Sequence, residues 1–262
     1  MKPSIYVNKV KMLLAQGKPT WGSGLADASD VLARFTVDTG IDFLWIDLEH
    51  RPYGCNEVKW VPIIARQAGC EPMVRVPSLD QGFIKKALDI GASCIMVPQV
   101  DNAQQARQAV EYSKYPPEGC RGVGALWVLV AGGSLPEYEQ SANDEVCVVV
   151  QIETPEGIKN MDEICQVDGV DIVFAGPADL AATLGHLGNP DHPDVKQFLA
   201  QFPERVNQYG KHAGISVRGV EASAEAYQQG YRMIVIGSVV VSGSSALRCD
   251  LQALRKQSAG ED

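Results

Sequence analysis

The side chains best suited to chemistry in this sequence are acidic, basic and amide groups that lie in or just after short apolar runs. They are Asp47, Glu49, His50, Arg75, Gln151, Glu153 and Asp179. If the runs are parallel strands of one barrel, their carboxyl ends meet at one rim, where active sites of such barrels form. We therefore expect these side chains to face a common site.

Glu153 and Asp179 are candidate ligands of one divalent cation. They follow consecutive predicted strands, and two carboxylates with water make the oxygen-only site that Mg²⁺ or Mn²⁺ prefers. Helix capping is the alternative, because TPEG (154–157) and ADL (178–180) both resemble helix starts, where acidic residues favour the N-terminus. Position alone leaves both interpretations open.

Arg75 stands between two valines, Val74 and Val76. Neighbours on a strand point to opposite faces, so the valines face away from the arginine. An arginine that points into a barrel mouth must meet an anion or stay solvated. It either binds an anionic substrate or forms a structural ion pair.

Other chemical signatures are weak or missing. His186 and His192 lie in LGHLGNPDHPD without a partner at metal-ligand spacing, so they receive no role, and His212 opens a strand and is predicted to be structural. The sequence contains no G-x-S-x-G, P-loop or G-x-G-x-x-G motif. No lysine is clearly placed as a Schiff-base nucleophile.

Eight near-continuous apolar runs are predicted to be strands, as expected for parallel strands covered on both faces. They are Thr20–Leu25, Phe43–Leu48, Pro72–Val76, Cys94–Gln99, Cys147–Ile152, Asp171–Gly176, Ala213–Val217 and Met233–Gly237. Helical patterns lie between them, the clearest at Gln81–Leu88, Ala103–Tyr112, Gly157–Gln166 and Asp194–Tyr209. This alternation predicts a single (β/α)8 TIM barrel domain over residues 1–262, with a doubly wound sheet as the alternative. The Gly-rich segment 119–143 breaks the pattern and is predicted to be a functional loop.

Composition excludes several classes of partner. The formal net charge of −9 disfavours nucleic acid and anionic membrane surfaces. No apolar run is long enough to cross a bilayer and no signal peptide is evident, which predicts a cytoplasmic protein. The seven cysteines are scattered and odd in number, so buried free thiols are expected rather than disulfides or a zinc site.

The chain resembles the HpcH/HpaI aldolase family, the class II pyruvate aldolases, across nearly its whole length. The matching segments, in order, are FLWIDLEH (43–50), MVRVPSLDQGFIKKALDIGA (73–92), VPQVDNAQQARQAV (97–110), KYPPEGCRGVG (114–124), VVVQIETPEGIKNMDEI (148–164), GVDIVFAGPADLAATLGHLGNPDHPDV (169–195) and MIVIGS (233–238). The resemblance implies a TIM barrel of the phosphoenolpyruvate/pyruvate type. It also implies reversible cleavage of a 4-hydroxy-2-oxo acid to pyruvate and an aldehyde. Examples are 2-keto-3-deoxy sugar acids and 4-hydroxy-2-oxoheptanedioate-like acids.

The resemblance assigns roles to particular residues. It implies Glu153 and Asp179 as ligands of Mg²⁺, Mn²⁺ or Co²⁺. It implies that Arg75 binds the oxo oxygen of pyruvate and stabilises the enolate. His50 is implied as the histidine on the base side, acting through water, and Asp89 as the carboxylate that orients it.

Substrate contacts and assembly are implied in the same way. Gln151 and the backbone at Ala178 are implied as contacts to pyruvate, and the family commonly forms homo-oligomers, hexamers or trimers. An acidic protein can bind an acidic substrate when a metal inverts the local field.

Two departures leave the aldehyde and the reaction open. Bulky residues occupy LWV (126–128) in a loop that lies near the aldehyde in the family, and Arg51 and Tyr53 replace the usual small residues. Arg51 could meet a carboxylate of the acceptor or could simply be solvated. The alternative activity is that of a related barrel acting on oxaloacetate or an acyl-CoA ester, as a decarboxylase, citrate synthase or citramalyl/citryl lyase. A non-enzymatic binding protein is disfavoured because His50, Arg75, Glu153 and Asp179 are all present.

Overall fold

The computed structural model describes residues 6–259 and forms a closed barrel of eight parallel strands in sequential order, β1 to β8. The strands are β1 Thr20–Gly24, β2 Phe43–Asp47, β3 Glu71–Arg75, β4 Cys94–Val97, β5 Cys147–Ile152, β6 Ile172–Ala175, β7 His212–Ser216 and β8 Met233–Val235. Pairing of β1 with β8 closes the barrel, with Trp21 beside Ile234. The predicted TIM barrel is therefore confirmed, and each strand lies within or overlaps a predicted run.

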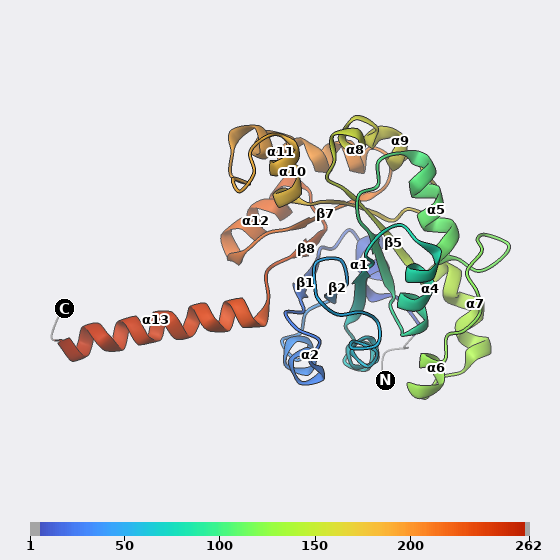
Figure 1. Ribbon diagram of the computed structural model, residues 1–262, viewed down its shortest axis with the longest axis horizontal. Coiled ribbons are helices and arrows are strands. Elements are labelled where there is room, and N and C mark those ends of the chain that lie inside the picture. The colour runs from blue at the N-terminus through green and yellow to red at the C-terminus, as the bar shows by residue number, and fades with distance from the viewer. Residues whose placement is uncertain (1–5, 260–262) are drawn as a thin grey trace.

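Helices alternate with the strands and surround the barrel (Figure 1). They are α1 Lys9–Ala15, α2 Asp30–Val37, α3 Val61–Gln67, α4 Gln81–Asp89, α5 Ala103–Ser113, α6 Trp127–Val130, α7 Leu135–Glu145, α8 Pro155–Lys159, α9 Met161–Cys165, α10 Pro177–Thr183, α11 Pro193–Asn207, α12 Gly219–Gln229 and α13 Val239–Ala259. Local sequence starts several of them: the side chains of Ser29, Asp80 and Asn102 cap α2, α4 and α5. The predicted helix Gly157–Gln166 is in fact two short helices, α8 and α9, that meet at Asn160.

Two apolar layers follow from the alternation of side chains along each strand. One fills the barrel interior and includes Phe43, Met73 and Phe174. The other lies between strands and helices and includes Val74 and Val76. Gly22 is needed in the interior because a Cβ there would lie 2.2 Å from the Phe43 ring.

The prediction of a functional loop over 119–143 is wrong in its structure. The segment contains α6 and α7, and Trp127, Val128 and Tyr138 are buried in a third apolar cluster. The Trp127 ring packs under the Arg66 guanidinium at 4.3 Å. Because α7 leads directly into β5, the end of this segment lies at the amino end of that strand, away from the rim where the predicted site residues meet.

The last helix, α13, is unlike the others. It extends away from the barrel, and Figure 1 shows it as an isolated rod that ends at the C-terminus. All its side chains from Val240 to Ser258 are exposed. No helix among residues 6–259 combines the length and apolar character that spanning a membrane requires. All seven cysteines are free thiols, as predicted, and four of them are buried.

Candidate active site at the carboxyl ends of the strands

Arg75 is the last residue of β3 and points into the barrel. Val74 and Val76 belong to the outer apolar layer, whereas Met73, two residues before Arg75, belongs to the interior layer. The predicted orientation of Arg75 is therefore confirmed. Only 5% of Arg75 is exposed, so neighbouring groups must balance its charge.

Asp47 holds the Arg75 guanidinium in a two-pronged pair. The register of β2 and β3 places the two residues side by side. Arg75 Nε donates to Asp47 Oδ1 at 2.9 Å and Nη2 donates to Oδ2 at 2.8 Å. The Trp45 ring lies 4.7 Å from the guanidinium carbon. Burial raises the pKa of Asp47, but hydrogen bonding and the charge of Arg75 outweigh it and the pKa is lowered.

The third nitrogen of the guanidinium, Nη1, is directed toward other groups. It forms an ion pair with Glu49 Oε2 at 2.9 Å and donates to Gln151 Oε1 at 3.4 Å. Burial raises the pKa of Glu49, and Arg75 and His50 only partly oppose this effect. Because Asp47 occupies the other two donors, Nη1 is the donor most easily redirected to a bound oxygen.

Glu153 is a buried carboxylate close to Arg75, with 4% of the residue exposed. Gln151 Nε2 donates to Glu153 Oε2, and the backbone N–H of Gln99 donates to Oε1 at 3.3 Å. Gln99 reaches it from a left-handed backbone conformation, φ 52°, which is uncommon for a residue with a side chain and recurs at functional sites. Burial first, then the charges of Asp179 and Glu49, raise the pKa of Glu153 to about 8.

Gly176 allows the loop after β6 to lie against these groups. A Cβ at this position would stand 2.7 Å from both Gln151 Nε2 and Glu153 Oε2. The next residues begin α10, whose first turn carries Ala178 and Asp179, both exposed. The charge of Asp179 raises the pKa of Glu153, so Asp179 lies near Glu153 on the rim.

His50 follows β2 on the same rim. Its Nε2 lies 3.6 Å from Glu49 Oε2, and its backbone N–H donates to Asp47 Oδ1 at 3.4 Å. The side chain is 61% exposed, so it is accessible to a molecule that enters the barrel mouth.

Asp47, Glu49, Arg75, Gln151 and Glu153 form what we call the arginine–carboxylate centre. Asp47 and Glu49 pair with the guanidinium, and Asp179 is close enough to affect Glu153, so four carboxylates share this rim with one guanidinium. This excess of negative charge, supplied by oxygen donors in a partly buried site, fits a divalent cation such as Mg²⁺ or Mn²⁺. The pKa of Glu153 is raised first by burial and then by the negative charges of Asp179 and Glu49.

Asp89 lies elsewhere in the chain. It is the last residue of α4, which leads through Gly91 to the amino end of β4, whereas His50 follows the carboxyl end of β2. The nearest cation is Arg121, whose Nη2 lies 3.9 Å from Asp89 Oδ1. No hydrogen bond joins Asp89 to His50 among residues 6–259. Within one chain the two residues are at opposite ends of the barrel.

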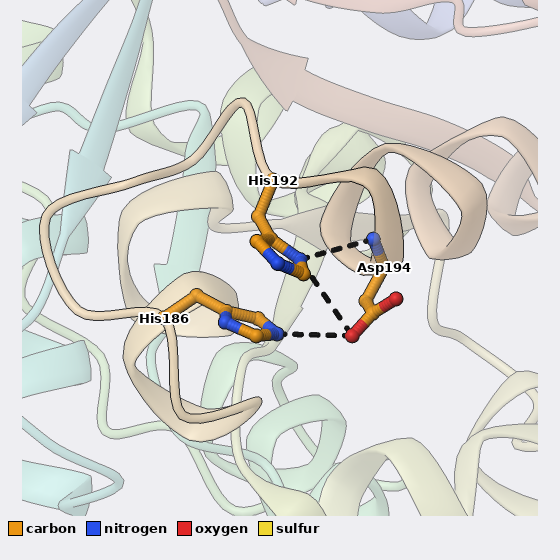
Figure 2. A group of neighbouring side chains, drawn as sticks. All are labelled: His186, His192 and Asp194. Carbon is orange, nitrogen blue, oxygen red and sulfur yellow. Dashed lines mark hydrogen bonds and ion pairs between the residues drawn. The ribbon is translucent and has the colours of Figure 1, made fainter.

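His186 and His192, which received no role from sequence, come together with Asp194 between α10 and the start of α11. We call these three residues the histidine cluster, and Figure 2 shows both rings directed at the Asp194 carboxylate. His186 Nε2 lies 3.0 Å and His192 Nδ1 3.6 Å from Asp194 Oδ2, and the ring centroids are 3.3 Å apart. The three ligand atoms lie within 4.8 Å of one another. The rings are stacked almost parallel, at 15°, and both nitrogens face the same carboxylate oxygen of Asp194.

Asp47 and Glu49 lie at the end of a predicted strand, and their sequence context assigns them no role. The structure makes them the direct partners of Arg75. Counting by two from Phe43 puts Asp47 on the interior face, the same face as Arg75, so alternation could have indicated the pair. No sequence pattern indicates that Gly176 must lie against Gln151 and Glu153, because this contact depends on how the loop after β6 is placed in space.

Comparisons with known proteins point to one family. Residues 25–246 match the family model described as HpcH/HpaI aldolase/citrate lyase. The chain is 38% identical over 231 residues to a 4-hydroxy-2-oxo-heptane-1,7-dioate aldolase of Escherichia coli, with 88% of each chain covered. It is 38% identical over 244 residues to the protein of the same name from Klebsiella pneumoniae, with 92% of each covered.

Solved structures give the same result. A HpcH/HpaI aldolase/citrate lyase family protein from Burkholderia cenocepacia J2315 superposes with a TM-score of 0.88 at 35% identity, covering 95% of this chain and 100% of that one. A citrate synthase, SbnG, superposes with a TM-score of 0.84 at 27% identity, covering 95% and 99%. The chain described here belongs to the HpcH/HpaI aldolase/citrate lyase family.

Proposed function

We propose that this protein is a divalent-metal-dependent aldolase that cleaves a 4-hydroxy-2-oxo acid to pyruvate and an aldehyde. The observation that carries the proposal is the arginine–carboxylate centre, in which a buried guanidinium and a buried carboxylate of raised pKa share one barrel rim. Relatives at 38% identity are named aldolases of a 4-hydroxy-2-oxo diacid.

The reaction breaks the bond between carbons 3 and 4 of the substrate. The proton of the 4-hydroxyl leaves, the carbonyl of the aldehyde forms, and the electron pair of the broken bond moves onto carbon 3 to give the enolate of pyruvate. Protonation of carbon 3 then completes pyruvate. Negative charge grows on the 2-oxo oxygen, and Nη1 of Arg75 is the donor available to it. Because Asp47 and Trp45 already fix the guanidinium, little reorganisation is needed, which is the basis of strong electrostatic stabilisation.

Glu153 and Asp179 are the proposed ligands of the cation, which we take to be Mg²⁺, Mn²⁺ or Co²⁺. When bound, the cation supplies Lewis-acid polarisation of the oxo acid and a template for its orientation. Gln151 and the backbone at Ala178 are proposed to contact the pyruvate part of the substrate. Gln151 suits this role because it already bridges Arg75 and Glu153.

His50 is proposed to move the proton of the 4-hydroxyl, through water. Its exposed ring next to Glu49 can exchange protons with solvent. The proposed role of Asp89 in orienting His50 requires a second copy of the chain, because the two residues occupy opposite ends of one barrel.

A homo-oligomer is part of the proposal. Helix α13 projects from the barrel with Val240, Leu247, Leu251 and Leu254 exposed, and apolar side chains at that density usually mark a contact with another chain. Val123 and Leu126, on either side of Gly124, which lies against Asp89, are exposed and offer a further apolar surface. Light scattering of the purified protein gives the number of copies, which we expect to be three or six.

A second candidate is a citrate-synthase-like or lyase reaction on oxaloacetate or an acyl-CoA ester. It is favoured by one observation, the similarity in fold to the citrate synthase at 27% identity. Both candidates use an enolate beside Arg75 and differ in the second substrate.

The test is a panel of substrates assayed for product with added Mn²⁺ or Mg²⁺ and again with a chelator. We expect pyruvate release from 4-hydroxy-2-oxo acids, abolished by the chelator and restored by the metal. Turnover of acyl-CoA esters with no cleavage of any 4-hydroxy-2-oxo acid would replace the aldolase assignment by the second candidate. Full activity in metal-stripped protein would remove the metal from the mechanism.

A further inference from the structure

The backbone carbonyl of Glu153 accepts a hydrogen bond from a side chain of α10. Thr183, the last residue of α10, donates from Oγ1 to the Glu153 carbonyl oxygen at 2.7 Å. Glu153 follows the last residue pair of the β5–β6 ladder, Ile152 with Ala175, so this carbonyl lies beyond the regular pairing of the two strands. The bond therefore joins the end of β5 to the helix that follows the next strand of the barrel.

The same helix carries Asp179, the other proposed metal ligand. Asp179 and Thr183 are four residues apart, and residues at that spacing lie on one face of an α-helix. At the beginning of α10, its N-cap residue Gly176 lies against the Glu153 carboxylate, where a Cβ would stand 2.7 Å from Oε2. Helix α10 thus contacts Glu153 at both of its ends, and the face that carries Asp179 is turned toward the end of β5.

Apolar packing holds α10 on the barrel but does not set its rotation. Leu180 and Ala181 are fully buried, and burial of apolar surface has no preferred direction. The hydrogen bond from Thr183 does have one, because the interaction weakens steeply when donor and acceptor are misaligned. A small rotation of α10 would carry Asp179 away from Glu153 while Leu180 stayed buried. The bond from Thr183 opposes this movement.

We infer that Thr183 is a positioning residue for the metal site: its hydroxyl fixes α10 to the end of β5 and so sets the separation of the Glu153 and Asp179 carboxylates. This inference rests on the proposed function, which makes those two residues the ligands of a divalent cation. Mg²⁺ demands near-ideal ligand geometry, so a small displacement of one carboxylate lowers affinity. Thr183 acts through Glu153 and Asp179 and contacts neither cation nor substrate.

The test compares wild-type protein with Thr183→Val, which keeps the shape of the side chain without its hydroxyl, and with Thr183→Ser, which keeps the hydroxyl. Isothermal calorimetry measures the affinity for Mn²⁺, Mg²⁺ and Ca²⁺, and thermal unfolding in chelator measures stability without metal. Thr39→Val is the matched control. Thr39 Oγ1 also donates to a backbone carbonyl, that of Thr36 at 2.6 Å, but it lies between α2 and the amino end of β2, away from the rim.

We expect Thr183→Val to bind Mn²⁺ roughly ten-fold more weakly than wild-type protein, as is usual when a residue that orients metal ligands is removed. The loss should be larger for Mg²⁺ than for Ca²⁺, which accepts a more flexible arrangement of ligands. Thr183→Ser should recover most of the affinity. Thr39→Val should bind Mn²⁺ as wild type does, although both valine variants should unfold at a lower temperature in chelator.

Unchanged Mn²⁺ affinity in Thr183→Val, whatever its stability, would overturn the inference and leave the bond a purely structural contact. Equal fold-losses for Mg²⁺ and Ca²⁺ would also overturn it, because the separation of the carboxylates would then not be what changes. Failure of wild-type protein to bind any of the three cations would instead overturn the metal site of the proposed function, and this inference with it.

Discussion

The arginine–carboxylate centre and the histidine cluster both bring ionisable side chains into contact, yet their surroundings differ. The centre stands on strand ends, with Arg75 and Glu153 almost fully buried. The histidine cluster lies between two helices, and the Asp194 side chain is 64% exposed. Burial leaves the charges of the centre unscreened and raises the pKa of Glu153 to about 8, whereas water screens the pairs of the cluster. Close ionisable side chains therefore perturb one another strongly only where they are buried, as in the arginine–carboxylate centre.

The largest expected effect is at Glu153. Glu153→Gln keeps the shape of the side chain but removes a proposed metal ligand, so we expect loss of metal binding and of aldolase activity with an intact fold. Isothermal calorimetry of a Mn²⁺ titration measures metal binding, pyruvate release measures activity, and circular dichroism measures the fold. Glu156→Gln, an exposed neighbour on α8, is the control and should behave as wild type. A Glu153→Gln protein that still binds Mn²⁺ with unchanged affinity would show that the cation sits elsewhere.

His50 sharpens the comparison because it is exposed like the cluster but lies beside the centre. His50→Gln should slow aldol cleavage by about 10²–10⁴-fold, the usual contribution of general acid–base catalysis. Oxaloacetate decarboxylation should fall less, since it needs no hydroxyl deprotonation. Steady-state rates of both reactions in the same preparation give the ratio. Equal losses would mean that His50 positions the substrate and moves no proton.

Substitution of Arg75 tests whether the fixed geometry of its N–H donors contributes to catalysis beyond its positive charge. Arg75→Lys keeps the charge but cannot pair with both oxygens of Asp47 while donating to the mouth, so we expect kcat to fall by about 10²–10³-fold. Asp47→Asn should lose less, and the double variant should lose less than the product of the two, since the residues act as one unit. Additive losses in this cycle would contradict the interpretation that Asp47 acts by holding Arg75.

The pH dependence of stability separates the buried centre from exposed carboxylates. In metal-free protein Glu153 keeps its proton up to a pKa of about 8 when folded, but only to about 4.5 when unfolded. Across that interval the folded state binds more protons, so the free energy of unfolding should fall as pH rises. Thermal unfolding in chelator should show this slope in wild-type protein and a flatter one in Glu153→Gln. An unchanged slope in the variant would show that other groups cause it.

How far sequence could predict this molecule depends on the range of the contacts. The strand Phe43–Asp47 and the position of Arg75 follow from apolar runs and side-chain alternation, which are local. The contact between Gly176 and Glu153 and the gathering of His186 with Asp194 need loops to be placed in space, and no periodicity encodes that. The prediction for segment 119–143 is wrong for a related reason: α6 has only 4 residues, and Trp127 is buried by tertiary packing on Arg66, which a weak helical pattern cannot reveal.

The smallest effect is expected at the histidine cluster. His186→Ala removes one exposed ion pair and a ring stack, so the free energy of unfolding should fall by at most about 1 kcal/mol and aldolase activity should not change. Urea unfolding and pyruvate release measure the two quantities. Addition of Zn²⁺ supplies the sharper test. Because the rings already stack on each other and the Asp194 side chain is 64% exposed, Zn²⁺ should leave the unfolding temperature of wild-type and His186→Ala protein equally unaffected. A rise in wild-type protein alone would mean that the stack opens to bind a metal, and the contrast between a functional centre and a screened surface cluster would then fail.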